Sequence, residues 1–200
     1  MPKISFLLSA GGAPVFTSLE ILKELGIDPC YEIICDRICP ALLQARKLKI
    51  KNSLYEFNRN ISFSKFAKQK IKSFQSNLIF SLFSKHIDIK HVKDCINIHP
   101  GCLSSRPGLK AVEQSFVNKD SILITTAHNI NEKFDEGKPR LISLATINKL
   151  TLNDLNRISY AMKTFLITTI IFKNFSENKS EIRIINGATC SINQIKDFKK

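Results

Sequence analysis

Hydrophobic and polar positions follow two different periods along this chain. Continuous apolar runs bounded by glycine, proline or polar residues are typical of buried strands, whereas apolar residues spaced three and four apart predict helices. A strand, a glycine-containing turn and a helix come first, which is how doubly wound α/β folds begin. The pattern predicts strands at 3–8, 31–35, 54–57, 78–80, 96–98, 122–130, 141–147 and 182–185, and helices at 15–25, 40–48, 63–74, 111–117 and 152–172.

The order of these elements predicts an α/β fold with three layers: a doubly wound, Rossmann-like, mostly parallel sheet with helices on both faces. No repeat or low-complexity linker interrupts it, so we expect one domain over residues 1–200. The helix at 63–74 is basic on one side and apolar on the other. We interpret its apolar stripe as facing the core rather than a membrane.

The formal net charge of the chain is +13. Such a charge suits nucleic acid, an anionic membrane surface or small anionic substrates. The basic residues are spread out, no nucleic-acid-binding signature accompanies them, and no apolar run approaches the roughly 20 residues of a membrane span. We therefore expect small anionic partners, no nucleic acid and no membrane.

The cysteines change this picture little. The six cysteines include no Cys-x-x-Cys pair, and the N-terminus has no targeting pattern. We therefore expect reduced thiols, no metal and a cytoplasmic protein, either a monomer or a homodimer.

Candidate chemistry gathers at the end of one strand, in the run Ile96-Asn97-Ile98-His99-Pro100. Alternation along a strand places Asn97 and His99 on one face, and Pro100 ends the strand because it has no backbone donor. A carboxylate, Asp135, follows the next apolar strand. An amide, an imidazole and a carboxylate that converge on one cleft suit acyl chemistry, because they can stabilise an oxyanion and move protons.

These residues carry a family resemblance. The ordered set consists of Asn97-Ile98-His99-Pro100, Pro107-Gly108-Leu109, Glu113-Gln114, and His128 followed by Asp135 and Gly137. It resembles the folate-dependent formyltransferases, and among these most of all the glycinamide ribonucleotide formyltransferases, over nearly the whole chain.

The resemblance implies a formyltransferase-type fold and the transfer of a formyl group from 10-formyltetrahydrofolate to a primary amine, with no metal. It implies catalytic roles for Asn97, His99 and Asp135. The amide and the charged imidazole would stabilise the oxyanion, and the carboxylate would relay a proton. Folate contacts are implied for Phe80, Ser81, Leu82, His128 and Gly137.

The acceptor side departs from the family pattern. The turn after the first strand implies a substrate-phosphate site at Gly11, Gly12 and Ala13, but Ala13 and Pro14 replace the polar residues that the family has there. The same turn can be read as no more than a tight connection between strand and helix. Where the family has an arginine near the folate, this chain has Ser81. Where the family has a glutamate on the last helix, the nearest position in this chain is about Ala161.

Four functions remain open from the sequence. The first is formylation of glycinamide ribonucleotide in purine synthesis. The second is formylation of another amine, such as a nucleotide-linked amino sugar. The third is a non-catalytic relative that keeps the fold, and the fourth is hydrolysis of formyltetrahydrofolate, which usually accompanies an additional N-terminal domain. The complete set Asn97, His99 and Asp135 favours an enzyme, because a binding module does not need it.

Overall fold

The structure is a computed structural model of the chain, and it describes residues 3–57, 61–83, 87–88, 94–103, 108, 110–131, 137–175 and 189–190. Its strands are β1 (Lys3–Leu8), β2 (Cys30–Cys35), β3 (Lys51–Leu54), β4 (Leu78–Leu82), β5 (Cys95–His99), β6 (Ile122–Asn129), β7 (Pro139–Thr146) and β8 (Thr189–Cys190). Its helices are α1 (Ala13–Glu24), α2 (Pro40–Lys47), α3 (Phe63–Phe74), α4 (Ala111–Val117) and α5 (Leu152–Phe175).

The strands form one sheet in the order β3-β2-β1-β4-β5-β6-β7-β8. The first five pair in parallel with one another, whereas β6 pairs with β5, β7 with β6 and β8 with β7 in antiparallel fashion. The order reverses between β1 and β4, which is the switch point where doubly wound folds open a cleft at the carboxyl ends of their strands. The predicted doubly wound, mostly parallel sheet is confirmed.

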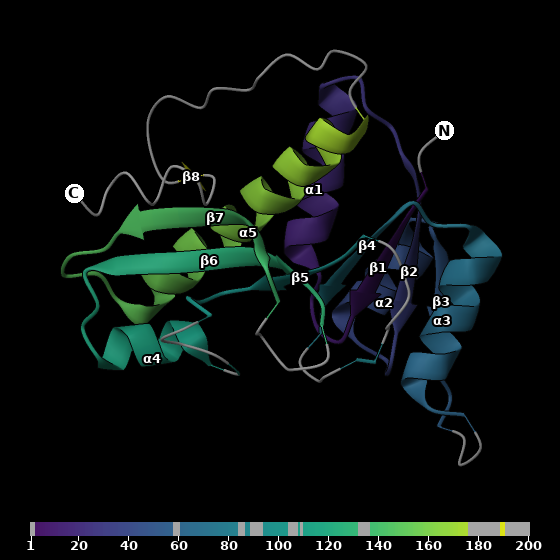
Figure 1. The fold of residues 1–200 in the computed structure, drawn as a ribbon, viewed down its shortest axis with the longest axis horizontal. Helices are drawn as coiled ribbons and strands as arrows, with labels where there is room; N and C mark the ends of the chain where they lie inside the picture. The colour runs from purple at the N-terminus through teal and green to yellow at the C-terminus, as the bar shows by residue number, and fades with distance from the viewer. Residues whose placement is uncertain are drawn as a thin grey trace.

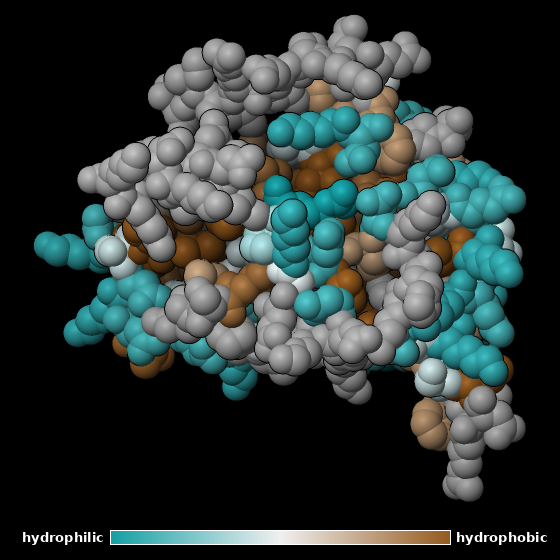
Figure 2. Space-filling model, viewed as in Figure 1, coloured by the Kyte–Doolittle hydropathy of each residue, from teal (hydrophilic) through white to brown (hydrophobic). Residues whose placement is uncertain are grey.

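Helices cover both faces of the sheet (Figure 1). On one face, α1, α2 and α5 enclose the main core around Phe6, Phe80 and Leu166. On the other face, α3 contributes Ala67 and Ile71 to a second cluster. The stripe of α3 therefore faces the core, as predicted, and its hydrophilic residues cover the outer side of this helix at the right of Figure 2.

The antiparallel part extends beyond the parallel strands. In Figure 1 the β6–β7 pair reaches to the left of the parallel strands, with α4 beneath it. A third apolar cluster, which includes Val112, Leu123 and Leu155, fixes α4 and the start of α5 against this pair. The helix α5 runs from this cluster back to the main core, so it links the two parts of the sheet.

The bounds of the third and fourth predicted strands differ from those in the structure. The third strand is Lys51–Leu54 rather than 54–57, because these residues, most of them polar, pair with Glu32–Cys35 of β2 at the edge of the sheet. The fourth continues two residues further, to Leu82. The strand expected at 182–185 lies outside the described residues.

Candidate active site

The pairing of β5 with β6 brings Asn97 and His128 together. They are Cα partners in the antiparallel register, and the Asn97 amide nitrogen lies 3.1 Å from the His128 Nε2. Ile96 and Ile98 point to the opposite face and join the main core. The alternation predicted for this strand is therefore confirmed, and it places the polar side chains on the face that carries α3.

The hydrogen bonds of His128 define its tautomer. Its Nδ1 lies 3.0 Å from the carbonyl oxygen of Asn129, which can only accept, so Nδ1 carries the hydrogen. In the neutral ring Nε2 then accepts, and the Asn97 amide nitrogen donates to it. This bond fixes which way the Asn97 amide points, because the reversed amide would place its oxygen against a lone pair. The imidazole of His128 is thus a support for Asn97.

His99 ends β5 beside this pair. Its Cα partner on β6 is Thr126, and its side chain is only 4% exposed. The Thr126 hydroxyl donates to the carbonyl of Gly101 at 2.9 Å, which holds the chain where it turns away after Pro100. Asn97, His99, Thr126 and His128 therefore form one polar patch on two adjacent strands.

Gly137 lies where the chain returns to start β7. A Cβ atom added there would be 1.5 Å from the carbonyl oxygen of Asn129 and 2.8 Å from the His128 Nδ1. Only glycine fits this close approach, which follows the bulge in β6 between Ala127 and His128. Asp135, the predicted catalytic carboxylate, lies outside the described residues, so its role stays a prediction.

The residues predicted to contact folate on β4 lie within the strand rather than in a loop after it. Phe80 is fully buried and stacks on Phe6 with ring centroids 5.5 Å apart, so any part it takes at a ligand site falls to its backbone. Ser81 is a Cα partner of Asn97 and is 3% exposed. Leu82 is the last residue of β4 and is partly buried against the main core.

The predicted phosphate site forms the connection between β1 and α1. Gly11 is exposed and has open space around its Cα, whereas Gly12 has a φ of +66° and a Cβ there would lie 2.8 Å from Leu8 and 2.9 Å from Ala41. Ala13 is exposed and begins α1. Gly12 is thus required by the turn itself, whatever the turn binds.

Few backbone donors remain in this turn. Pro14 has no N–H, and the amides of Val15 and Phe16 both donate to the carbonyl of Gly12. Among the amides from Gly11 to Phe16, those of Gly11, Gly12 and Ala13 remain for a phosphate. The positive end of the α1 dipole remains, with no acidic residue in its first turn.

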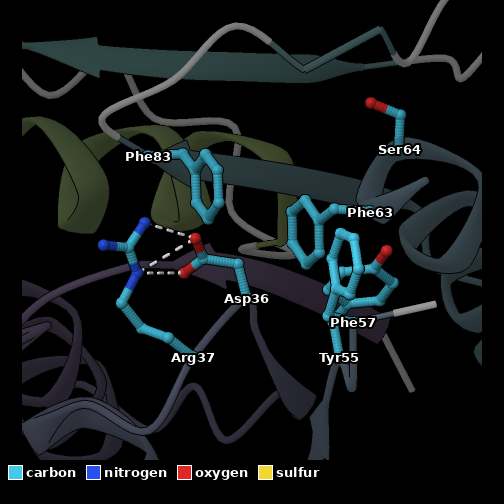
Figure 3. Close-up of a pocket in the computed structure, with 7 residues that line it drawn as sticks. All are labelled: Asp36, Arg37, Tyr55, Phe57, Phe63, Ser64 and Phe83. Atoms are coloured by element: carbon cyan, nitrogen blue, oxygen red, sulfur yellow. Dashed lines mark hydrogen bonds and ion pairs between the residues drawn. The ribbon is translucent and has the colours of Figure 1, made fainter. Parts of the chain in front are cut away.

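A pocket of about 410 Å³ opens beside the end of β4 (Figure 3). Phe63 and Phe83 stack on one side of it with ring centroids 4.8 Å apart. The Arg37 guanidinium forms a forked ion pair with Asp36, so the two charges that line the pocket balance each other. The pocket is lined by Asp36, Arg37, Tyr55, Phe57, Phe63, Ser64 and Phe83. Aromatic faces and a neutral pair suit a flat ring rather than a bare anion.

Two buried thiols, Cys35 and Cys95, are shielded from solvent. Burial raises the pKa of Cys35 and of Cys95 well above the usual range of a thiol.

Among the residues that the structure describes, no group of three or more histidine, cysteine, aspartate or glutamate side chains could hold a metal ion. In the same residues, no helix is both long and apolar enough to cross a membrane.

The last helix turns Ala161 outward to solvent. The residue that turns inward near this level is Lys163, which is partly buried. Burial lowers the pKa of its ammonium, and the carboxylate of Glu113 acts in the opposite direction. Sequence reasoning missed this lysine, although a basic residue between Met162 and Thr164 within an apolar helix was a visible signal.

Sequence reasoning also missed the aromatic pocket. Its residues come from the segments that follow β2, β3 and β4 and from the first turn of α3, and they are neighbours because these strands end at the same edge of the sheet beside that helix. The signal that could have found it is the group of polar and aromatic residues directly after each parallel strand.

This arrangement defines a doubly wound α/β fold of the formyltransferase type. The fold is similar to phosphoribosylglycinamide formyltransferase from Bacillus halodurans, with a TM-score of 0.78, 17% identity, and coverage of 92% of this chain and 100% of the other. It is also similar to phosphoribosylglycinamide formyltransferase from Campylobacter jejuni, with a TM-score of 0.76, 21% identity, and coverage of 88% and 98%.

A formyltetrahydrofolate deformylase from Pseudomonas putida has the same fold, with a TM-score of 0.70, 17% identity, and coverage of 85% of this chain and 64% of the other. No protein-family model matches the chain, and neither does any curated protein sequence. The likeness confirms the predicted fold class.

Proposed function

We propose that this chain transfers a formyl group from 10-formyltetrahydrofolate to a primary amine of a small anionic acceptor, glycinamide ribonucleotide in purine biosynthesis. The observation that carries the proposal is the pair formed by Asn97 and His128 beside His99 on the face of β5 and β6. An amide held in a defined orientation next to a buried imidazole suits the stabilisation of an oxyanion. The likeness in fold to formyltransferases supports the same reaction.

In this proposal the acceptor nitrogen attacks the formyl carbon, and negative charge develops on the formyl oxygen. Asn97 donates a hydrogen bond to that oxygen, and His99 in its charged form stabilises it. The bond from the formyl carbon to the folate nitrogen then breaks. The proton lost by the amine passes to that nitrogen, with Asp135 as the relay. The products are the N-formyl acceptor and tetrahydrofolate.

The folate site is proposed to run along the ends of β4 and β5. Ser81, Leu82 and Gly137 border it, and the aromatic pocket beside Phe83 continues it. The aromatic rings of Phe63 and Phe83 offer flat surfaces to the ring systems of a folate. The resemblance to folate enzymes supports this placement.

A second acceptor is favoured by one observation. The turn between β1 and α1 has no polar side chain at Ala13 or Pro14, and two of its amides are used within the turn. An acceptor other than glycinamide ribonucleotide, such as a nucleotide-linked amino sugar, would suit an altered turn.

The test is a formyl-transfer assay with the whole chain and 10-formyltetrahydrofolate, in which the absorbance change of the folate and the mass of the product are followed. Glycinamide ribonucleotide, a panel of amino-sugar nucleotides and water alone are compared. Turnover with glycinamide ribonucleotide is expected. Turnover only with another amine would support the second acceptor, release of formate without an acceptor would indicate hydrolysis, and folate binding without any turnover would overturn the proposal.

A further inference from the structure

Two buried sulfur atoms are in contact at the carboxyl end of β2. Cys35 is the last residue of β2, Cys39 directly precedes α2, and their sulfur atoms lie 3.7 Å apart. Both side chains belong to the main core. Within the described part of the chain, the pair does not belong to a group of three or more side chains that could hold a metal ion. Two thiols whose sulfurs touch have the arrangement from which a disulfide forms.

The backbone on either side of the pair keeps the two sulfurs facing each other. Cys35 is fixed by the sheet, because β2 lies between β1 and β3 and Cys35 is the Cα partner of both Leu8 and Leu54. The start of α2 is fixed less firmly, by a bond of 3.2 Å from the Ala41 amide to the Ala10 carbonyl. The sulfurs lie 3.7 Å apart and must approach by a further ~1.7 Å to form a bond. Most of that movement therefore falls to the segment that connects β2 with α2.

Access to solvent favours Cys39 as the sulfur that is oxidised first. It is 6% exposed, whereas Cys35 is fully buried, and its neighbour Ile38 is 67% exposed. Burial raises the pKa of the Cys35 thiol well above its usual range, and the neighbouring Cys39 raises it further. Cys35 is thus a poor first target for an oxidant. Its contact with Cys39 instead suits it to react second, with a sulfur that is already oxidised.

The turn between the two cysteines lines the aromatic pocket. Asp36 and Arg37 form the forked ion pair there, and they line the same pocket as the stacked rings of Phe63 and Phe83 (Figure 3). Both charged residues lie inside the short loop that a bond between the sulfurs would close. Their backbone must follow when the sulfurs approach, so the ion pair and the wall of the pocket are displaced.

We infer that Cys35 and Cys39 form an oxidative modification site, which closes as an intramolecular disulfide and alters the aromatic pocket. The oxidant is a peroxide. Its O–O bond breaks as Cys39 becomes a sulfenic acid and one water leaves. The Cys35 thiol then attacks that sulfur, the S–O bond breaks, and a second water leaves. The two thiols lose two electrons and two protons, and the peroxide is reduced to two waters.

The first test locates the disulfide. The whole chain is treated with hydrogen peroxide, remaining thiols are alkylated, and the protein is digested with trypsin. Trypsin cleaves after Arg37, so a bond between Cys35 and Cys39 joins the peptides 24–37 and 38–46 until a reductant separates them. Cys30 lies in the first of these peptides, and Cys30→Ser is therefore the control.

We expect the joined peptides in the wild type and in Cys30→Ser, and their loss in Cys39→Ser. Serine is a preferred residue directly before a helix, so this variant should keep α2. If thermal unfolding shows that Cys39→Ser is not folded, Cys35→Ala replaces it. A wild type without joined peptides, or joined peptides that disappear in Cys30→Ser, would overturn the inference.

The second test measures the pocket, and here the inference rests on the proposed function for the identity of the ligand. Binding of 5-formyltetrahydrofolate is measured by calorimetry after the peroxide is removed. Oxidation should weaken binding about tenfold, because displaced walls lose contacts with the ligand. A reductant should restore the affinity, and Cys39→Ser should not respond to peroxide. Equal affinities of the reduced and oxidised wild type would overturn the effect on the pocket. Joined peptides in a chain that binds no folate when reduced would support the modification site and overturn the proposed function.

Discussion

The polar face of β5 and β6 and the turn between β1 and α1 hold their polar groups in different ways. On the face, side chains from two consecutive strands, β5 and β6, meet in the strand register, and Asn97 donates to His128 at 3.1 Å. In the turn, no side chain is polar at Ala13 or Pro14, and backbone amides do most of the bonding. The sheet fixes the proposed chemistry, whereas the acceptor site depends on a turn and on the helices around it.

This difference explains how one fold can keep a reaction and change its substrate. A side chain on a central strand cannot move without disturbing the register of its neighbours. A turn tolerates substitution as long as its backbone path is kept. Here that path requires glycine at position 12, whereas side chains are accommodated at Ala13 and Pro14, which can therefore vary.

The largest expected effect tests the chemistry of the strand face. Asn97→Ala should lower kcat for formyl transfer by about 10²–10³, because it removes a donor to the developing oxyanion. Asn118→Ala makes the same chemical change on the exposed end of α4 and should have no effect. Steady-state kinetics of both variants, with circular dichroism to confirm folding, checks this. Equal kcat values for the two variants would contradict the assigned role of Asn97.

The close backbone approach at Gly137, which supports that face, is expected to give the second-largest effect, this time on the stability of the fold. Gly137→Ala would place a methyl group 1.5 Å from the Asn129 carbonyl oxygen, so β6 or β7 must shift. We expect the free energy of unfolding to fall by about 3 kcal/mol or more. Urea denaturation measures it, with Gly11→Ala as the control because nothing lies within 4 Å of a Cβ there. A Gly137→Ala protein as stable as the control would mean that this approach is not close.

The turn should show a smaller loss of stability. Gly12→Ala forces a left-handed backbone on alanine and brings its Cβ to 2.8 Å from the flexible end of Leu8. We expect the free energy of unfolding to fall by about 1–3 kcal/mol. The same denaturation experiment detects it, again against Gly11→Ala. An unchanged stability would show that the turn does not need glycine, and the phosphate interpretation of Gly12 would gain weight.

The smallest expected effect distinguishes a role of His128 in positioning Asn97 from a role in packing alone. His128→Phe keeps a ring but removes the acceptor of the Asn97 amide, and kcat should fall about tenfold with KM little changed. His128→Gln returns an acceptor oxygen and should recover part of the rate. A merely structural role for His128 would instead move the thermal stability of both variants and leave kcat per folded molecule as it is.

Much of the fold could be predicted because local patterns carry it. The helices 63–74 and 111–117 have the predicted bounds, since their apolar spacing begins and ends sharply. The third strand is predicted too late because its residues are mostly polar and at best partly buried at the edge of the sheet, while the more apolar residues Tyr55 and Phe57 line the pocket instead. Edge strands lack the hydrophobic alternation that sequence reasoning uses.

The sequence by itself determined the succession of strands and helices, the face shared by Asn97 and His99, and the residue types for acyl chemistry. These follow from short-range periods and from spacing, which the chain carries locally. Only the tertiary structure decided that His128 supports Asn97, that Phe80 belongs to the core, and that Lys163 rather than Ala161 turns inward on α5. Such facts depend on strand register and on helix rotation against the sheet, and both are set by packing between residues far apart in sequence.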